Sequence, residues 1–312
     1  MKKIISKIFE KIESNCDSIR IIFPEHNNRV KEAKKKLKQM GFKVQDINSF
    51  NLEKTDFCEQ MAKLKFSKNW PDEKVKEFSE NPLNYSLGLI KNDLADVLIA
   101  GSNYTTADVA RSSLRIIGLS SNTKCLSSSF LMIPELDKND SRVFSFADCA
   151  IVPEPSENQL ADIAKDTAIS HNFLTGHNPR VAFLSFSTNS SANHYRVKKV
   201  KKALEIFKNK YSNIDVESTE VQFDSATVPE VAIKKYPDSI LKGDANVLIY
   251  PNLDAGNIAY KIMQRFGSYS AIGPLLQGLN APIHDLSRGC SIDDIVDIAI
   301  IGSAQAINNA NV

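Results

Sequence analysis

The chain has 312 residues, of which 42% are hydrophobic and 24% are charged, and its formal net charge is +2. This length predicts two domains, each large enough for its own core. The composition is that of an ordinary globular enzyme. A net charge this small provides no strong basic field, so we expect no nucleic-acid partner.

The N-terminal segment and the cysteines indicate where the protein works. The segment MKKIISKIFEKIES starts with basic residues, but its apolar residues recur at helical spacing and no small-residue cleavage site follows. This pattern favours an amphipathic helix over a signal peptide. No run approaches the roughly 18 apolar residues of a membrane span, so we expect no membrane association. Five scattered cysteines, without a CxxC pair or a metal spacing with histidine, predict reduced thiols in a cytoplasmic protein.

Short β-rich runs alternate with helical patterns along the chain. The predicted strands are residues 19–23, 44–47, 96–100, 127–133, 143–146, 149–152, 180–186, 216–221 and 246–250. The main helical patterns are residues 29–40, 106–117, 157–170, 196–210, 258–266 and 292–306. This alternation predicts an α/β fold with mostly parallel strands and helices on both faces. The last helix is apolar nearly all round, so we expect it to be buried.

Lysines cluster on two of these helices, at residues 34–36 and 198–202. A solvated helix face is the ordinary interpretation of such a cluster. Contact with a phosphate-rich ligand is the alternative.

The domain boundaries are weakly marked, because no linker rich in Pro, Ser or Gly stands out. The candidate breaks are the polar turn at residues 120–124 and the turn at 280–282. If the C-terminal helix packs on the first domain, the second domain is an insertion. The prediction is therefore a first domain of residues 1–120 plus 286–312 and an inserted domain of residues 121–285.

Three strand–loop–helix turns are candidate anion sites. In the first, AGSNYTTADVAR, Thr105 or Thr106 can cap the following helix, whose free N–H groups and dipole suit an anion. Arg111 can clamp a phosphate there, or it can simply pair with Asp108 on the surface.

The other two turns are weaker indications. In YPNLDAGNIAYK, Gly256 permits close backbone approach and Asn257 can cap the helix, although most such turns only connect elements. In FLSFSTNSSA, hydroxyl groups at a strand end can bind phosphate or serve the local turn.

The stretch GPLLQGLNAPIHDLSRGCSIDD, residues 273–294, combines two glycine-bounded turns with a Ser-Arg-Gly sequence and two aspartates that open the last helix. Ser287, Arg288 and Asp294 supply a hydroxyl, a guanidinium and a carboxylate, which together can orient an oxyanion, bind a phosphate and move a proton. Each has an ordinary alternative. SIDD is a capping-box pattern, Ser287 can be a turn residue, and Arg288 can pair with Asp285.

Several blocks, in order and at sensible spacing, resemble phosphate acetyltransferases (phosphotransacetylases) of the phosphate acetyl/butyryltransferase family. Besides residues 273–294, they are FPEHNNRVKEA, ENPLNYSLGLIKNDLADVLIAGSNYTTADVARSSLRIIG, CAIVPEPSENQLADIAKDTA, RVAFLSFSTNSSANHYRVKKVKKA, VQFDSATVPEVAIKKYPDS and ANVLIYPNLDAGNIAYKIMQRFG. Together these blocks span nearly the whole chain.

The resemblance implies a two-domain α/β fold like that of the isocitrate and isopropylmalate dehydrogenases, with the active site in the interdomain cleft. The implied reaction is acetyl-CoA + phosphate = acetyl phosphate + CoA. It is reversible and uses no metal and no cofactor besides coenzyme A as a substrate. The resemblance also implies a homodimer whose acetyl phosphate passes to acetate kinase.

The resemblance assigns roles to individual residues. It implies that Asp294 takes the proton from the CoA thiol, that Ser287 donates a hydrogen bond to the carbonyl oxygen, and that Arg288 holds the phosphate. Arg111 matches an arginine that binds anionic ligand groups. Lys65 stands where the family has an arginine associated with CoA, which keeps the charge but loses the bidentate fork.

Other positions near the implied site are less definite. Gly256, Asn257 and Cys290 are expected beside the substrate or CoA. Ser190 departs from the family pattern, because it stands where a glycine is common. His284 stands where asparagine is usual; from the sequence we interpret it as a turn residue.

Three other functions remain open at this point. A phosphate butyryltransferase would differ by a slightly deeper acyl pocket. A non-catalytic module that binds acetyl-CoA as a regulatory signal would show an eroded 273–294 stretch or an extra catalytic domain, and this chain shows neither. A metal-dependent hydroxyacid dehydrogenase would need a cluster of aspartates and a nucleotide site, for which we find no convincing set.

Overall fold

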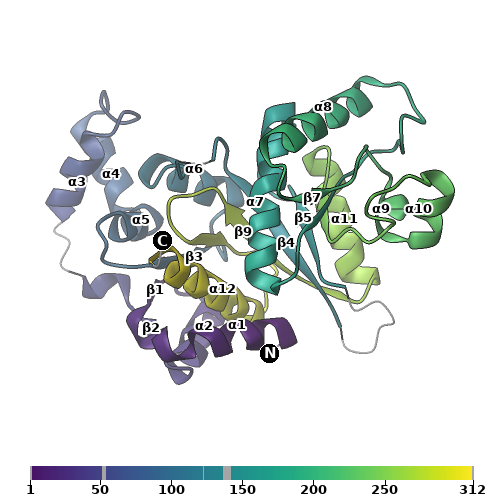
Figure 1. Ribbon diagram of the computed structural model, residues 1–312. Coiled ribbons are helices and arrows are strands. Elements are labelled where there is room, and N and C mark those ends of the chain that lie inside the picture. Colours follow the sequence, from purple (N-terminus) through teal and green to yellow (C-terminus); the bar gives the residue numbers. More distant parts are fainter. Residues whose placement is uncertain (1, 51–53, 122, 136–141, 311–312) are drawn as a thin grey trace. The chain divides into compact units, whose positions relative to one another are not determined.

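The computed structural model describes residues 2–50, 54–121, 123–135 and 142–310 (Figure 1). The chain forms two compact units. The first contains Met1–Ser121 and Leu279–Val312, and the second contains Asn122–Gly278. Each unit has its own β-sheet.

The first unit is built on a four-stranded parallel sheet in the order β10–β3–β1–β2. Its strands are β1 (Arg20–Ile22), β2 (Lys43–Val44), β3 (Val97–Ala100) and β10 (Ile283–Asp285). Its helices are α1 (Lys3–Ile12), α2 (Asn28–Gln39), α3 (Lys54–Ala62), α4 (Asp72–Glu80), α5 (Pro82–Lys91), α6 (Thr106–Ile116) and α12 (Ile292–Ala310), with short 3₁₀ turns at Glu13–Ser18 and Ile47–Ser49.

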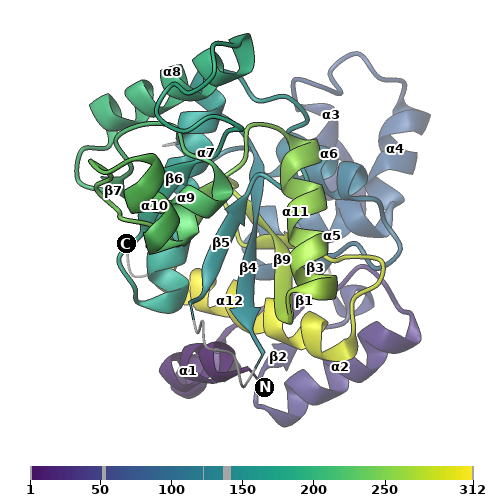
Figure 2. The ribbon, with the colours of Figure 1, turned by 90° about the vertical axis from the view of Figure 1, so that its right-hand side faces the viewer.

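Helix α12 forms much of the core of this unit. Its apolar side chains, such as Ile295, Ile300 and Ile301, are fully buried, as the sequence predicts. The helix packs against α1, α2 and β3 (Figures 1 and 2). This packing returns the C-terminal segment to the first unit, which makes the second unit an insertion.

The second unit is built on a six-stranded sheet in the order β7–β6–β8–β5–β4–β9. Its strands are β4 (Ser127–Pro134), β5 (Phe144–Ala147), β6 (Arg180–Phe183), β7 (Asp215–Val216), β8 (Val247–Ile249) and β9 (Tyr269–Gln277). Its helices are α7 (Glu157–Thr175), α8 (Tyr195–Lys210), α9 (Phe223–Thr227), α10 (Pro229–Lys235) and α11 (Leu253–Phe266). The sheet is mixed, because β4 runs antiparallel to both β5 and β9.

Two segments differ from the sequence prediction. Residues 149–152 form a loop and not a strand, because the buried Asp148 carboxylate accepts hydrogen bonds from the backbone N–H groups of Ala150, Ile151 and Val152. Those donors are therefore not available to a neighbouring strand. Residues 269–277, for which the sequence analysis predicted no strand, form the long strand β9. Pro274 is tolerated there because β9 is an edge strand.

The second limit of the insertion also differs from the expected one. Residues 279–285, which the sequence analysis placed in the inserted domain, belong to the first unit. The physical reason is strand pairing: β10 extends the first sheet, with Asp285 opposite Ala100 of β3.

Candidate active site in the first unit

Three loops that lie far apart in the sequence meet at one edge of the first sheet. FPEHNNR follows β1, AGSNYTT follows β3, and HDLSRGC contains the end of β10. Because the three strands are parallel, their carboxyl ends lie at the same edge, where α/β proteins commonly bind ligands. Hydrogen bonds between the loops show that they are in direct contact.

Glu25 connects the first loop to the second. Its carboxyl group is buried, and Oε1 accepts hydrogen bonds from the backbone N–H groups of Gly101 (3.2 Å), Asn103 (2.6 Å) and Tyr104 (3.1 Å). The backbone donors of this loop, which precedes helix α6, are thus bound by a side chain of the protein.

Asp285 connects the third loop to the second. Its buried carboxylate accepts a hydrogen bond from the Thr106 hydroxyl at 2.5 Å. Position 101, which packs against this carboxylate, requires glycine, because a Cβ on Gly101 would lie 2.0 Å from Asp285 Oδ1. Burial raises the pKa of Asp285 to about 7; the charge of Glu25 adds to the rise, and Thr106 and Arg288 oppose it.

Arg29, at the start of α2, holds the Ser-Arg-Gly turn from outside. Its Nη1 donates to the carbonyl oxygens of Arg288 (2.8 Å) and Cys290 (2.7 Å). Within the turn, the Cys290 N–H donates to the Ser287 carbonyl oxygen at 2.9 Å, and Ser287 Oγ accepts from the Gly289 N–H at 3.3 Å. The side chains of Ser287 and Arg288 are exposed. The turn therefore presents a hydroxyl and a guanidinium to solvent on a fixed backbone.

Asp294 forms the capping box that SIDD predicts. Its Oδ2 accepts from the Ser291 N–H (2.9 Å) and hydroxyl (2.8 Å), and its own N–H donates to Ser291 Oγ at 3.1 Å. The other oxygen, Oδ1, lies 3.8 Å from Lys2 Nζ, and the side chain is 32% exposed. One carboxylate oxygen is thus anchored at the start of α12, and the other forms an ion pair with Lys2.

The two predicted anion-binding cations of this unit are exposed. Arg111 Nη1 lies 3.5 Å from Asp108 Oδ1, which is the surface ion pair that the sequence offered as the ordinary alternative. The Arg111 side chain is 56% exposed. The cap of α6 is Thr105, which forms a capping box with Asp108. Lys65 is an exposed residue between α3 and α4, and among the described residues it forms no hydrogen bond or ion pair with the Ser-Arg-Gly turn.

Gly256 and Asn257 lie in the second unit, on α11. The expected cap at Asn257 is wrong, because α11 begins earlier and Asn252 Oδ1 accepts from the Ala255 N–H at 3.0 Å. Asn257 Nδ2 instead donates to the Cys149 carbonyl oxygen at 2.9 Å. Gly256 does permit close approach, but the approaching group is the Asp148 carbonyl oxygen, 2.2 Å from where a Cβ would be.

Replacing Gly256 by alanine is expected to destabilise the protein by about 1–3 kcal/mol, because a methyl group that overlaps backbone atoms forces the helix away from the 148–149 loop. This cost exceeds the roughly 1 kcal/mol by which alanine favours a helix. Urea unfolding of the two proteins measures the difference. Unchanged stability together with a raised KM for CoA would contradict this packing role and favour a ligand contact.

The serine-rich loop after β6 is organised by a residue that sequence reasoning missed. Buried Glu220 accepts hydrogen bonds from the Ser187 hydroxyl (2.8 Å) and the Ser190 N–H (2.7 Å). Asn189 and Ser190 have φ values of 48° and 63°, in the left-handed region that favours glycine. The family resemblance implies a glycine at position 190, which suits this conformation. In this chain the residue is Ser190, and the hydrogen bonds to Glu220 hold it in the left-handed region.

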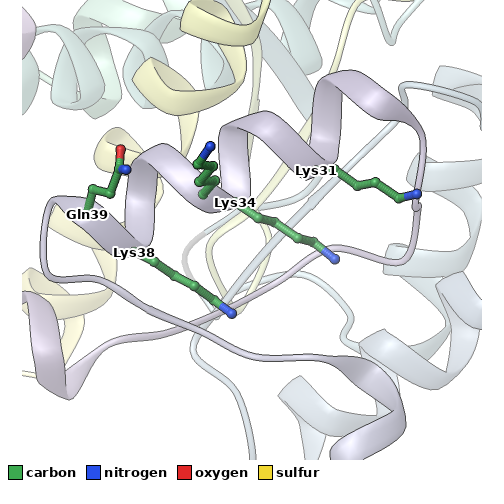
Figure 3. Close-up of a pocket in the computed structure, with 5 residues that line it drawn as sticks. Lys31, Lys34, Lys38 and Gln39 are labelled. Carbon is green, nitrogen blue, oxygen red and sulfur yellow. The ribbon is translucent and has the colours of Figure 1, made fainter.

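The lysine cluster on α2 borders a hollow of about 470 Å³ on the helix surface, lined by Lys31, Lys34, Lys35, Lys38 and Gln39. Lys31, Lys34 and Lys38 extend from the same side of the helix (Figure 3). Burial lowers the pKa of Lys34, whose Nζ lies 5.5 Å from the centre of the Phe23 ring. None of the residues predicted for the active site lines this hollow.

Comparison with known proteins identifies the family. A family model described as "Phosphate acetyl/butaryl transferase" matches residues 3–303. The chain belongs to this family. Among curated members, it is 42% identical over 266 residues to the phosphate acetyltransferase of Thermoanaerobacterium thermosaccharolyticum, covering 85% of this chain and 81% of the relative. It is 39% identical over 281 residues to that of Clostridium acetobutylicum, covering 89% and 84%.

Solved structures agree with this assignment to the phosphate acetyltransferase family. A phosphotransacetylase from Streptococcus pyogenes superposes with a TM-score of 0.85 at 33% identity, covering 97% of this chain and 99% of that one. The EutD phosphotransacetylase from Staphylococcus aureus gives a TM-score of 0.79 at the same identity and coverage. The family resemblance and the α/β fold class expected from the sequence are thereby confirmed.

The described residues contain neither a membrane-spanning helix nor a cluster of metal-ligating side chains. No helix in the described ranges is long and apolar enough to cross a membrane. Within the same part of the chain, no group of three or more His, Cys, Asp or Glu side chains is arranged to hold a metal ion.

Proposed function

We propose that this protein catalyses the reversible transfer of an acetyl group between coenzyme A and inorganic phosphate. The observation that carries the proposal is the turn at Ser287 and Arg288, whose exposed side chains stand on a backbone held by Arg29 at the carboxyl edge of a parallel sheet. The curated relatives named phosphate acetyltransferase support it.

In the direction of acetyl-CoA synthesis, the first requirement is a thiolate. A thiol with a pKa near ~8.5 is mostly protonated at neutral pH, so a positioned carboxylate helps to generate the nucleophile. Asp294 is the proposed base. Because Ser291 holds Oδ2, the carboxylate has a fixed orientation, and Oδ1 is the atom that takes the thiol proton.

The thiolate then attacks the carbonyl carbon of acetyl phosphate, and negative charge builds on the carbonyl oxygen. Ser287 Oγ accepts a hydrogen bond from the Gly289 N–H, so its own O–H can donate to that oxygen. Arg288 holds the phosphate, which leaves with the electron pair of the broken C–O bond. Its guanidinium makes no ion pair with any residue in the described ranges, so its fork of donors is available to the anion.

The other predicted site residues differ in the roles that we propose for them. Exposed Arg111 and Lys65 are proposed to contact anionic groups of the substrates. Cys290 is a buried neighbour of the turn, and burial raises the pKa of its thiol, so it is not proposed to react. Gly256 and Asn257 are left out of the mechanism, because their observed contacts are with the 148–149 loop.

The setting of the enzyme is also part of the proposal. Five free cysteines are typical of a reducing compartment, which supports a cytoplasmic location. We propose a homodimer that passes its acetyl phosphate to acetate kinase, as the family resemblance implies. Sedimentation of the purified protein tests the dimer.

The function is tested by mixing purified protein with acetyl phosphate and CoA and following thioester absorbance. Thioester formation that phosphate inhibits is the expected result. Absence of turnover while acetyl-CoA still binds would overturn the proposal in favour of a regulatory module.

The same assay run backwards with acetyl-, propionyl- and butyryl-CoA is expected to give the highest kcat/KM for acetyl-CoA. Each additional methylene changes transition-state binding by about 1–3 kcal/mol, or roughly 10–200-fold. The 39–42% identical relatives named phosphate acetyltransferase favour the acetyl group. Faster turnover of butyryl-CoA would contradict this choice and favour a phosphate butyryltransferase.

A further inference from the structure

An apolar stripe runs along the exposed face of α11 in the second unit. Ile258, Ile262 and Phe266 follow one another at intervals of four residues, so they lie on the same side of the helix. These residues are 57%, 55% and 87% exposed. The other side of α11 already belongs to the core, where Tyr260 stacks on Phe130 of β4 with the ring centres 3.9 Å apart. The stripe is therefore a second apolar face of the helix, and it points away from the core of its own unit.

Neighbouring segments extend this apolar surface. Residues of α9 and α11 share one core cluster with β4, β5 and β8, so these two helices cover the same face of the second sheet (Figure 2). Among the described residues, seven of the eleven large apolar residues that are exposed fall in this part of the chain: Phe223, Val228, Ile233, Ile240, Ile258, Ile262 and Phe266. Such a concentration of exposed apolar side chains is typical of a surface that another molecule covers.

The charges beside the stripe indicate which molecule covers it. Asp254 lies in the first turn of α11 and Arg265 in the last turn, and both are exposed. Their separation of eleven residues is close to three full turns, so they flank the stripe on the same side of the helix. Neither forms an ion pair with another residue in the described ranges. The surface thus has an apolar centre, an acidic end and a basic end.

We propose that α11 pairs antiparallel with α11 of a second copy of this chain, about a two-fold axis, so that the two apolar stripes cover each other. The axis passes between Ile258 and Ile262. Asp254 of each copy then lies opposite Arg265 of the other, which gives two ion pairs across the interface. This inference rests on the homodimer in the proposed function and locates its interface.

The charge pattern is self-complementary only in this direction. A two-fold interface uses the same patch on both copies. In an antiparallel pair the acidic end of one helix meets the basic end of the other. In a parallel pair the two Arg265 side chains would lie side by side, as would the two Asp254 side chains, and such contacts between like charges are costly.

The interface is tested with Ile258→Asp in the full-length protein. Sedimentation equilibrium measures the dissociation constant (Kd) of the dimer, for which the parent is expected to sediment as two copies. The substitution places a charge near the centre of the interface, and the two-fold axis repeats it, so we expect Kd to rise by at least about 100-fold. Because Ile258 is exposed, the monomer should still fold.

Ile169→Asp is the matched control. Ile169 is also 57% exposed and also lies on a helix of the second unit, but its helix, α7, packs on the opposite face of the sheet. This variant is expected to keep the Kd of the parent. If Ile169→Asp dissociates as Ile258→Asp does, the effect is not specific to the stripe and the proposal fails.

Two results would overturn the location of the interface. If Ile258→Asp dimerises as tightly as the parent, the two stripes do not cover each other. If the parent sediments as a monomer at every concentration, a second copy does not cover the stripe, and its occupant is a different molecule.

Charge reversal tests the direction of pairing and leaves the stripe intact. Asp254→Arg and Arg265→Asp each place like charges opposite one another, so each is expected to raise Kd about tenfold. The double variant restores opposite charges, and its Kd should return to within a few-fold of the parent value. A double variant that dissociates as readily as the two single effects combined would contradict the antiparallel pairing.

Thioester formation by the same preparations separates this inference from the proposed transferase activity. If the parent forms no thioester, the proposed transferase has failed, and the dissociation constants still decide the interface. If the parent is an active dimer and Ile258→Asp dimerises equally well, only the location of the interface is wrong.

Discussion

Replacing Asp294 by asparagine is expected to lower kcat by about two to four orders of magnitude, the usual contribution of a positioned general base. CoA affinity should change little, because the substitution removes a proton acceptor and not a binding contact. Asparagine can still accept from Ser291 and is well suited to helix starts, so α12 should keep its first turn. Steady-state kinetics and CoA titration of the same preparation measure the two effects.

Ser291→Ala separates the two roles of Asp294. It removes the hydroxyl that shares two of the three hydrogen bonds of the capping box and leaves the carboxylate in place. We expect a loss of stability of about 0.5–2 kcal/mol and a kcat within several-fold of the parent. Near-normal turnover in Asp294→Asn would mean that Asp294 only caps α12, and the base would have to be sought elsewhere.

Removing the hydroxyl of Ser287 is the second substitution with a large expected effect. Ser287→Ala should lower kcat by about 10²–10³, or about 2.7–4 kcal/mol, as the loss of one hydrogen-bond donor to a developing oxyanion does. Since the bond strengthens in the transition state, kcat and kcat/KM should fall together while KM stays similar. Initial rates over a range of acetyl phosphate concentrations measure both constants.

Two features make this substitution informative. Ser287 is exposed, and its Oγ only accepts from the Gly289 N–H, so the alanine variant should unfold at nearly the parent urea concentration. Ser287→Thr retains a hydroxyl on the same turn and should recover part of the rate. If Ser287→Ala raises KM and leaves kcat unchanged, Ser287 contributes to binding of the substrate in the ground state. The proposed hydrogen bond in the transition state would then be wrong.

Several features of the fold followed from local sequence. Helix α12 was expected to be buried because apolar side chains surround it, and Ile295, Ile300 and Ile301 are fully buried. The capping boxes at Thr105 and Asp294 were also predictable, because a cap requires only residues within one turn of helix. Strands were harder to predict. No strand was predicted around Gly273 and Pro274, and only the edge position of β9 shows why these residues fit one.

The sequence by itself determined the α/β class, the family and the short pattern that contains Ser287, Arg288 and Asp294, because each depends on neighbouring residues or on ordered blocks. The tertiary structure alone decided which distant groups surround that pattern. Glu25 and Gly101 are 76 residues apart, Thr106 and Asp285 are 179 apart, and Arg29 and Arg288 are 259 apart. Local periodicity carries no information over such separations; these groups meet because β1, β3 and β10 are parallel neighbours whose carboxyl ends share one edge.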